Sequence, residues 1–300
     1  MSRVVVGVIG GTGLGEALGA LGGGEARAIE TPFGPPSGPI TLTEVSGVPV
    51  ALLARHGEGH MRNPSSVPYR ANIWALKALG VTHVLASGAC GSLREEVAPK
   101  HLVIPDQVID RTFRRASTFF DDLAVHVELA APFCGTLRNA LVKAAAGFPA
   151  RVHQGGTYVC MEGPQFSTRA ESELHRSWGA SLIGMTAMPE AKLAREAELC
   201  YAIVALPTDY DCWKPHPATL DHAKLIEEIL GNVKAATQNA IELIRRAIPQ
   251  VAAAAEKPCP CQSALELAIW SDRSRIPSHV REKLRPILGK YLDGDAGRAP

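Results

Sequence analysis

The chain of 300 residues has few aromatic side chains, no excess of charge of one sign and no long apolar run. Lysine and arginine number 31 against 30 aspartates and glutamates, so the charge balance does not indicate nucleic acid or an acidic membrane face as a partner. No apolar run approaches the roughly 18 residues that cross a bilayer. The apolar stretch near the N-terminus is short and lacks a cleavage-site pattern. We therefore expect a cytoplasmic protein with no membrane partner.

The cysteine content also excludes a class of protein. Seven cysteines are an odd number spread over a long chain, which differs from the disulfide framework of a small secreted domain. The apolar share of 46% is enough for a substantial core, while 28 glycines and 22 prolines predict many tight turns rather than a helical bundle. The composition therefore predicts a globular protein with a sheet.

Short β-branched runs alternate with helical patterns along the first 250 residues. Strands are predicted at 4–9, 48–53, 83–86, 102–104, 157–160, 182–185 and 201–206, and helices at 69–79, 133–146, 168–178, 187–198 and 222–247. This alternation predicts an α/β fold with a single domain and a central mixed, largely parallel sheet flanked by helices. Ligands of such sheets bind where the strands end.

The composition changes after residue 250, where an alanine-rich stretch leads to Cys259-Pro-Cys261. We predict a catalytic domain over 1–250 and a C-terminal helical extension over 251–300. Within the extension, helices are expected at 264–270 and 278–292, with a break at Pro286 because proline cannot donate the helical hydrogen bond.

The first candidate site is the glycine-rich segment from Gly7 to Gly13, directly after a predicted strand. Backbone N–H groups in such a turn can face a phosphate, and Thr12 adds a hydroxyl. The dinucleotide fingerprint fails because Glu16 occupies the place of its third glycine, and the Walker lysine is absent. This disfavours a nicotinamide-linked dehydrogenase, and a tight turn without a ligand is the alternative.

The second candidate is Arg55-His56, which ends another predicted strand. A guanidinium offers a planar fork to an oxyanion, and the imidazole is a second donor beside it. His56 and His60 have a spacing that suggests zinc, but Gly57 and Gly59 disfavour the helix that would bring both rings to one face. We expect no metal, and a solvated charged turn is the alternative.

Three further segments follow strands. Small residues from Ser87 to Ser92 would let a ligand lie against bare backbone, although a packed turn explains them equally. Met185-Thr186 lies at the next strand end. Asp209 and Asp211 would share a face if the extended chain continues, and a carboxyl of raised pKa there could protonate a leaving group. A turn or a helix cap is the alternative for this pair.

In this order the segments resemble the trimeric or hexameric purine nucleoside phosphorylase family. The matching stretches cover residues 4 to about 213 and include GVIGGTGL, ETPFGPPS, LLARHGEGH, YRANIWALK, GACGSLREE, MEGPQFSTRAE, WGASLIGMTAMPEAKLAREAELCYA and PTDYDCW. The resemblance implies a homotrimer or homohexamer. It further implies phosphorolysis of 5′-methylthioadenosine to adenine and 5-methylthioribose 1-phosphate, with inorganic phosphate as co-substrate and no metal or organic cofactor.

The resemblance also implies roles for individual residues. The phosphate site would comprise Thr12, Arg55, His56, Ser87 and Thr186. The nucleoside site would comprise Ala89, Phe166 and Ser167 flanking the base, Met185 against the ribose, and His126 and His222 at the 5′ substituent; for Ala89 no more than substrate binding is implied. His126 matches a histidine that a neighbouring subunit lends. Asp209 and Asp211 match the pair that recognises a 6-aminopurine and protonates its N7.

Two residues depart from the family pattern. Gly88 stands where a hydroxyl residue commonly contacts phosphate, so Ser87 or a bare amide must compensate. His222 stands where a small apolar residue often lines the 5′ pocket, which leaves the preference for a thioether over a 5′-hydroxyl open. A phosphorylase of broader or 6-oxopurine specificity and a non-catalytic nucleoside-binding protein therefore remain alternatives.

The cysteines form the last prediction. Cys259 and Cys261 have one intervening residue, a spacing that is poor for zinc and strained for a disulfide. By resemblance to thermostable relatives, Cys259–Cys261 and Cys134–Cys200 are candidate disulfides, and free thiols are the alternative.

Overall fold

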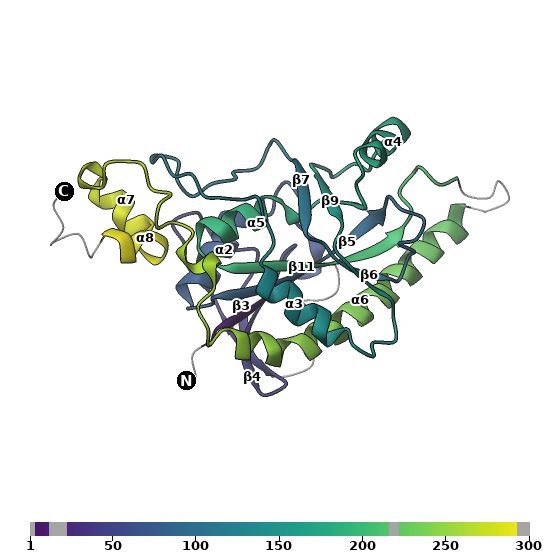
Figure 1. Cartoon of the computed structure of the whole chain (residues 1–300), viewed down its shortest axis with the longest axis horizontal. Helices are drawn as coiled ribbons and strands as arrows, with labels where there is room; N and C mark the ends of the chain where they lie inside the picture. Colours follow the sequence, from purple (N-terminus) through teal and green to yellow (C-terminus); the bar gives the residue numbers. More distant parts are fainter. Residues whose placement is uncertain (1–3, 12–22, 216–221, 293–300) are drawn as a thin grey trace.

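The computed structural model describes residues 4–11, 23–215 and 222–292. In this part of the chain a central sheet of eleven strands lies between two layers of helices, and the C-terminal segment lies at one end of the molecule (Figure 1). The strands are β1 (Val6–Gly10), β2 (Glu25–Arg27), β3 (Ile40–Val45), β4 (Val48–Ala54), β5 (His83–Ser92), β6 (Leu102–Ile104), β7 (Gln107–Arg111), β8 (Val152–Gln154), β9 (Thr157–Met161), β10 (Leu182–Gly184) and β11 (Cys200–Asp209).

Seven α-helices and three short 3-10 helices accompany the sheet in the described residues. They are α2 (Tyr69–Ala78), α3 (Gly135–Ala144), α4 (Arg169–Ser177), α5 (Ala187–Glu196), α6 (His222–Ala254), α7 (Ser278–Lys283), α8 (Arg285–Leu292), η1 (Glu58–His60), η2 (Pro260–Ser263) and η3 (Arg273–Arg275). Helix α4 begins with a capping box between Thr168 and Glu171, which satisfies two backbone N–H groups at its N-terminus.

The sheet is mixed and largely parallel, as the alternation of elements predicts. Strand β1 pairs in parallel with β4 and β5, and β11 pairs in parallel with the other edge of β5. Strand β5 then leaves β1 and pairs antiparallel with β10 through Gly91 and Ser92. The carboxyl ends of β1, β4, β5 and β11 consequently meet at one place.

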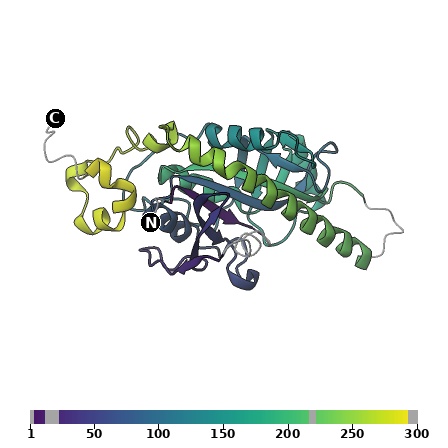
Figure 2. The same cartoon turned by 90° about the horizontal axis from the view of Figure 1, so that it is seen from below.

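Each face of the sheet has its own core. Val6 and Val8 of β1 pack with α3 and α6, whereas Ile9 packs with α2 and α5, because side chains alternate across a strand. Figures 1 and 2 show α3 and α6 on one side of the sheet. From Cys200 to Thr208 every residue of β11 is buried, as in strands covered by helices on both faces.

The structure corrects several predicted boundaries. Strand β5 continues six residues beyond the predicted end at Ala86, because its glycines stay extended while they pair with Val204 to Asp209 of β11. Helix α6 continues beyond the predicted end at Ala247 and past Pro249, because Ile248 and Val251 remain fully buried. Strands β2, β3, β7 and β8 are additions that the sequence analysis does not predict.

The predicted helix at 264–270 is wrong. There the backbone bonds to distant parts of the chain instead: the Leu265 N–H donates to Glu198 Oε1, and the Trp270 N–H donates to the Ala124 carbonyl. The predicted helix at 278–292 is present as α7 and α8, and the break next to Pro286 is confirmed.

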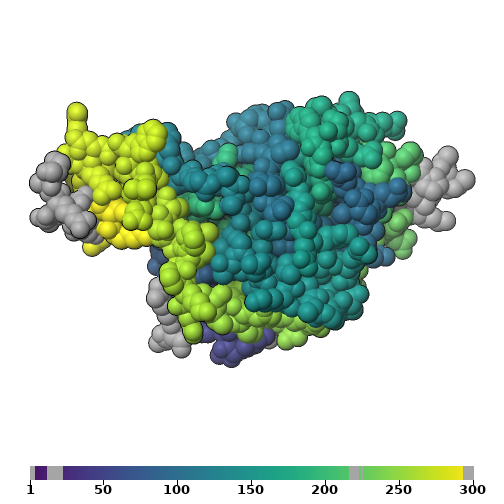
Figure 3. Space-filling view, viewed as in Figure 1, coloured from purple at the N-terminus to yellow at the C-terminus, as the bar shows by residue number. Residues whose placement is uncertain are grey.

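The C-terminal segment packs against the body through α2. The Trp74 Nε1–H donates to the Lys283 carbonyl at 3.2 Å, and the buried Leu284 and Leu288 join the core that contains α2. In the space-filling view this segment projects from one end of the molecule (Figure 3). The division of the chain near residue 250 stays a prediction. Among the described residues, no helix is both long enough and apolar enough to span a membrane.

Candidate active site

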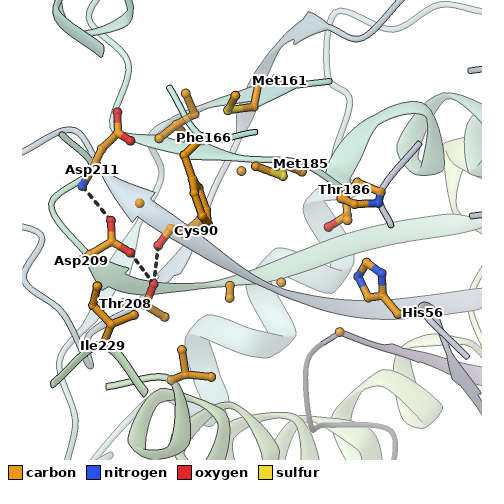
Figure 4. Close-up of a pocket in the computed structure, with 18 of the residues that line it drawn as sticks. His56, Cys90, Met161, Phe166, Met185, Thr186, Thr208, Asp209, Asp211 and Ile229 are labelled. Atoms are coloured by element: carbon orange, nitrogen blue, oxygen red, sulfur yellow. Dashed lines mark hydrogen bonds between the residues drawn. The ribbon is translucent and has the colours of Figure 1, made fainter. Parts of the chain in front are cut away.

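A cavity of about 330 Å³ lies where β1, β4, β5 and β11 end (Figure 4). Eight of the predicted site residues line it: Arg55, His56, Ala89, Phe166, Met185, Thr186, Asp209 and Asp211. Other described residues in its wall include Gly11, His60, Gly88, Cys90, Gly91, Met161, Thr208 and Ile229. The structure therefore gathers segments that are far apart in the sequence, from Gly11 to Ile229.

Arg55 is completely buried at the floor of this cavity. Its Nε and Nη2 donate to the two carboxylate oxygens of Glu190, both at 2.7 Å, and its Nη1 donates to the Ser87 carbonyl at 2.7 Å. Burial by itself would lower the pKa of Arg55, but the charge and hydrogen bonds of Glu190 outweigh it and raise the pKa. Glu190 Oε1 also accepts from the Tyr201 hydroxyl at 2.7 Å.

This arrangement changes the predicted contact between Arg55 and phosphate. The two-pronged edge of the guanidinium is occupied by Glu190, so a bidentate contact with phosphate is not open through that edge. Nη1 lies under the glycine-rich turn, 3.2 Å from where a Cβ on Gly11 would stand. Each terminal nitrogen has a second N–H, so the end-on edge formed by Nη1 and Nη2 and a partly neutralised charge remain for a ligand.

Ser87 and Gly11 close the floor beside Arg55. The Gly11 N–H donates to Ser87 Oγ at 3.3 Å, and a Cβ on Gly11 would meet the Ser87 carbonyl at 2.8 Å. Only glycine permits this approach. Ser87 is buried behind the turn and is not among the described residues that line the cavity. The predicted Thr12 lies outside the described residues.

His56 presents one ring nitrogen to the cavity. Its Nδ1 lies 2.7 Å from the Arg62 carbonyl, which can only accept, so Nδ1 carries the proton and Nε2 is left with a lone pair. Burial, assisted by the charge of Arg55, lowers the pKa of His56 to about 4. At neutral pH the ring is therefore an uncharged acceptor, suited to take a proton or hydrogen bond from a phosphate P–OH group.

Thr186 occupies the N-cap position of α5, and its side chain makes no capping hydrogen bond. Its hydroxyl thus remains for a ligand, and the backbone becomes regularly helical only after Met188, whose φ is −118° and ψ 140°. A Cβ on Gly88 would stand 3.2 Å from Thr186 Oγ1. The departure from the family pattern at residue 88 therefore gives space to the Thr186 hydroxyl.

The two carboxylates lie at the other end of the cavity (Figure 4). Asp209 Oδ1 accepts from the Asp211 N–H at 2.7 Å, and Oδ2 accepts from the Thr208 hydroxyl at 2.7 Å. The same hydroxyl lies 3.3 Å from the Cys90 carbonyl. Asp211 Oδ2 is buried without a hydrogen-bond partner in the described part of the chain. It is an acceptor that a ligand can satisfy.

Apolar side chains line the cavity between these ends. Met185 fills the space beside Gly163, where a Cβ would meet its sulfur at 2.5 Å. Phe166 lies across the cavity from Thr186 and is 84% exposed. Ser167 is adjacent to this wall, and its carbonyl accepts from the Cys212 thiol at 3.3 Å.

Of the two histidines predicted at the 5′ end, only the side chain of His126 is among the described residues. His126 is exposed and contacts the Trp270 ring, with centroids 4.5 Å apart. It is not among the described residues that line the cavity. His222 begins α6, and its side chain lies outside the described residues.

The sequence analysis does not predict three residues that position the site, Glu190, Arg115 and Glu162. Besides Glu190, a buried ion pair joins Arg115 Nε to Glu162 Oε1 at 3.2 Å. Arg115 Nη1 also donates to the carbonyls of Met185 and Met188, at 2.5 and 2.7 Å. This clamp joins the two segments that carry Met161 and Met185. The sequence offers only a general indication of such residues. A charged side chain at a predicted strand end needs a partner of opposite charge if it is buried.

The first prediction concerns the Arg55–Glu190 pair. In Glu190→Gln the guanidinium remains buried without a counter-charge, so the free energy of unfolding should fall by about 3–5 kcal/mol. Glu242→Gln is the matched control, because Glu242 pairs with Arg245 and Arg246 at the surface, where such a change costs about 1 kcal/mol or less. Urea unfolding measures both, and equal losses would contradict the importance of the buried pair.

The second prediction concerns His56. Its pKa of about 4 in the folded chain lies below the ordinary value of 6.5, so between these pH values the unfolded chain binds more protons. The free energy of unfolding should therefore rise from pH 4 to 6.5. His56→Asn keeps a donor for the Arg62 carbonyl and removes the titration, so this rise should shrink. The exposed His279→Asn is the control. Identical pH profiles for His56→Asn and the parent chain would refute the prediction.

Comparisons with known proteins identify the family of this chain. The profile of the phosphorylase superfamily matches residues 5–249. An S-methyl-5′-thioadenosine phosphorylase of Geobacter sulfurreducens is 49% identical and covers 96% of this chain and 99% of its own. One of Danio rerio is 44% identical, over 93% of this chain and 97% of its own.

Solved structures give the same result. A methylthioadenosine phosphorylase from an antarctic soil metagenomic library has a TM-score of 0.87 and 43% identity, over 96% of this chain and 100% of its own. A mutant adenosine/methylthioadenosine phosphorylase of Schistosoma mansoni in complex with methylthioadenosine has a TM-score of 0.81 and 34% identity, over 90% of this chain and 100% of its own. This chain belongs to the phosphorylase superfamily.

Proposed function

We propose that the chain catalyses phosphorolysis of 5′-methylthioadenosine to adenine and 5-methylthioribose 1-phosphate. The observation that carries this function is a cavity with two chemically different ends. His56 and the Thr186 hydroxyl lie at one end, the carboxyls of Asp209 and Asp211 lie at the other, and apolar side chains lie between them. The relatives named above supply the identity of the nucleoside.

The reaction needs both ends. When the N-glycosidic bond breaks, positive charge develops on the ribose and negative charge on the purine. Phosphate held by His56, Thr186 and the backbone at Gly11 would stabilise the ribose cation and attack C1′. The chemistry requires no metal and no organic cofactor, since phosphate itself is the nucleophile.

Asp209 would protonate the departing base at N7. Each of its oxygens accepts one hydrogen bond, and a protonated carboxyl oxygen can still donate its own proton to N7 while it accepts from Thr208 or Asp211. The Thr208 hydroxyl, which also lies 3.3 Å from the Cys90 carbonyl, would hold Oδ2 in place. Thr208 would therefore act as a positioning residue for the acid.

The unpartnered Asp211 Oδ2 favours a 6-aminopurine. A buried acceptor gains a hydrogen bond from the amino group of adenine, whereas the carbonyl of hypoxanthine would leave both acceptors unsatisfied. This argues against the alternative of 6-oxopurine specificity. Asp209 and Asp211 also form a turn, which was the alternative interpretation of this pair. The Asp211 N–H donates to Asp209 Oδ1 in an Asx-type turn.

The third prediction tests this function. The purified chain should release adenine from methylthioadenosine only when phosphate is present, and form the sugar 1-phosphate in equal amount. Asp209→Asn should lower turnover of adenine nucleosides by more than about tenfold and raise the relative rate on 6-oxopurine nucleosides, because an amide can donate to O6.

The controls separate the two parts of this prediction. Glu44→Gln changes an exposed carboxyl on β3 to an amide and should keep full activity. Nucleoside binding without phosphate-dependent turnover in the parent chain would support a non-catalytic binding protein instead. An unchanged preference for adenine over hypoxanthine in Asp209→Asn would remove Asp209 from base recognition.

We further propose a cytoplasmic homotrimer or homohexamer. His126 is exposed and does not reach the cavity of its own chain within the described residues, which is the arrangement expected of a residue lent to a neighbour. Phe166 and Phe113 also stay more than three-quarters exposed, and a neighbouring subunit would cover such surface.

The fourth prediction tests this assembly. A closed ring satisfies every such contact between identical subunits, so sedimentation under assay conditions should show a trimer or hexamer. A fully active monomer would contradict the shared site.

A further inference from the structure

Four cysteines from three distant parts of the chain meet on the side of the sheet that carries α3 and α6. Cys134 directly precedes α3, Cys200 begins β11, and Cys259 and Cys261 lie around the start of η2. All four are buried, and their sulfur atoms lie within 4.8 Å of one another. None of the four lines the cavity described above. We refer to them as the cysteine cluster.

The spacing of the sulfurs suits one central ion better than two disulfides. With zinc–sulfur bonds of about 2.3 Å, the sulfurs of a tetrahedral site lie about 3.8 Å apart. The Cys134 and Cys259 sulfurs lie 3.7 Å apart, whereas a disulfide requires about 2 Å. The Cys134 thiol also contacts those of Cys200 and Cys261, and Cys200 contacts Cys261. No pairing is therefore singled out.

A hydroxyl group and a helix N-terminus lie next to the cluster. The Thr136 hydroxyl lies 3.7 Å from the Cys259 sulfur. Cys134 is the N-cap of α3, so the positive end of that helix faces the cluster. Donors to ligand sulfurs of this kind accompany bound metals.

We propose that Cys134, Cys200, Cys259 and Cys261 bind one Zn²⁺ in a closed tetrahedral site. Four soft ligands in a tetrahedron select zinc, and four protein ligands leave no open position for a substrate, so the site is structural. Binding releases the thiol protons and involves no redox step. The ion would fasten the segment after α6 to β11 and α3. The proposal does not depend on the proposed activity.

From the sequence alone no metal is expected at these cysteines. Cys259-Pro-Cys261 by itself offers a poor spacing for zinc. The other two ligands come from 59 or more residues upstream, so only the fold brings the set together.

The fifth prediction uses the full chain, purified anaerobically with a reductant. Elemental analysis should find one zinc per chain. Exchange for Co²⁺ should give thiolate-to-cobalt charge-transfer absorption and the intense visible bands of tetrahedral cobalt. Removal of zinc by a chelator should lower the melting temperature, because an ion that binds the folded chain stabilises it.

Variants identify the ligands. Cys200→Ser and Cys261→Ser should each weaken zinc binding by more than about tenfold, since even outer-shell changes cost that much. Cys212→Ser is the matched control, because Cys212 is outside the cluster, and it should keep one zinc per chain. The cobalt spectrum of the parent chain stays decisive even if a variant fails to fold. Reduced parent chain that takes up neither zinc nor cobalt, disulfides among these cysteines without metal uptake after their reduction, or iron in place of zinc would overturn the proposal.

Discussion

The buried ion pair between Arg55 and Glu190 is the constraint on which the cavity depends. It joins the end of β4 to α5, and its further hydrogen bonds reach β5 through the Ser87 carbonyl and β11 through the Tyr201 hydroxyl. A charge removed from water is costly, and only a partner with well-placed hydrogen bonds compensates for it. The positions of four elements that form the floor are thus fixed by a single carboxylate and a single guanidinium.

A second buried ion pair, between Arg115 and Glu162, holds the wall of the cavity. Arg115 joins Glu162 to the backbone at Met185 and Met188, so the segments that form this wall are linked through one guanidinium. Burial alone would raise the pKa of Glu162, but hydrogen bonds from Ser65 and from backbone N–H groups, with the charge of Arg115, lower it to about 2. The stabilisation that Glu162 provides is therefore present above its ordinary pKa and is lost only as the pH falls towards about 2. The clamp stays charged across the range in which His56 titrates.

The sequence predicts the candidate site residues at the ends of the strands better than the buried charged residues that hold them in place. The family and the largely parallel α/β fold are confirmed, because glycine turns, Arg55-His56 and Asp209-Tyr-Asp211 are local patterns that follow apolar runs. Glu190 and Arg115 could not be assigned in this way, since their partners are 135 and 47 residues away and carry no local signal. The length of β5 was missed for a related reason: its glycines indicate a turn until pairing with β11 keeps them extended. The roles of the predicted site residues remain predictions.

The C-terminal segment connects the cysteine cluster to the proposed intersubunit site. After Cys261 the chain crosses to the segment around His126, where the His126 N–H donates to the Ala268 carbonyl at 2.9 Å and the Trp270 N–H donates to the Ala124 carbonyl at 3.0 Å. It then packs on α2 through α8. The backbone at His126 is thus held by a segment whose start lies in the cysteine cluster and whose end lies in the α2 core. A loss of order at Cys259 and Cys261 would loosen the backbone support of the histidine that a neighbouring active site is proposed to use.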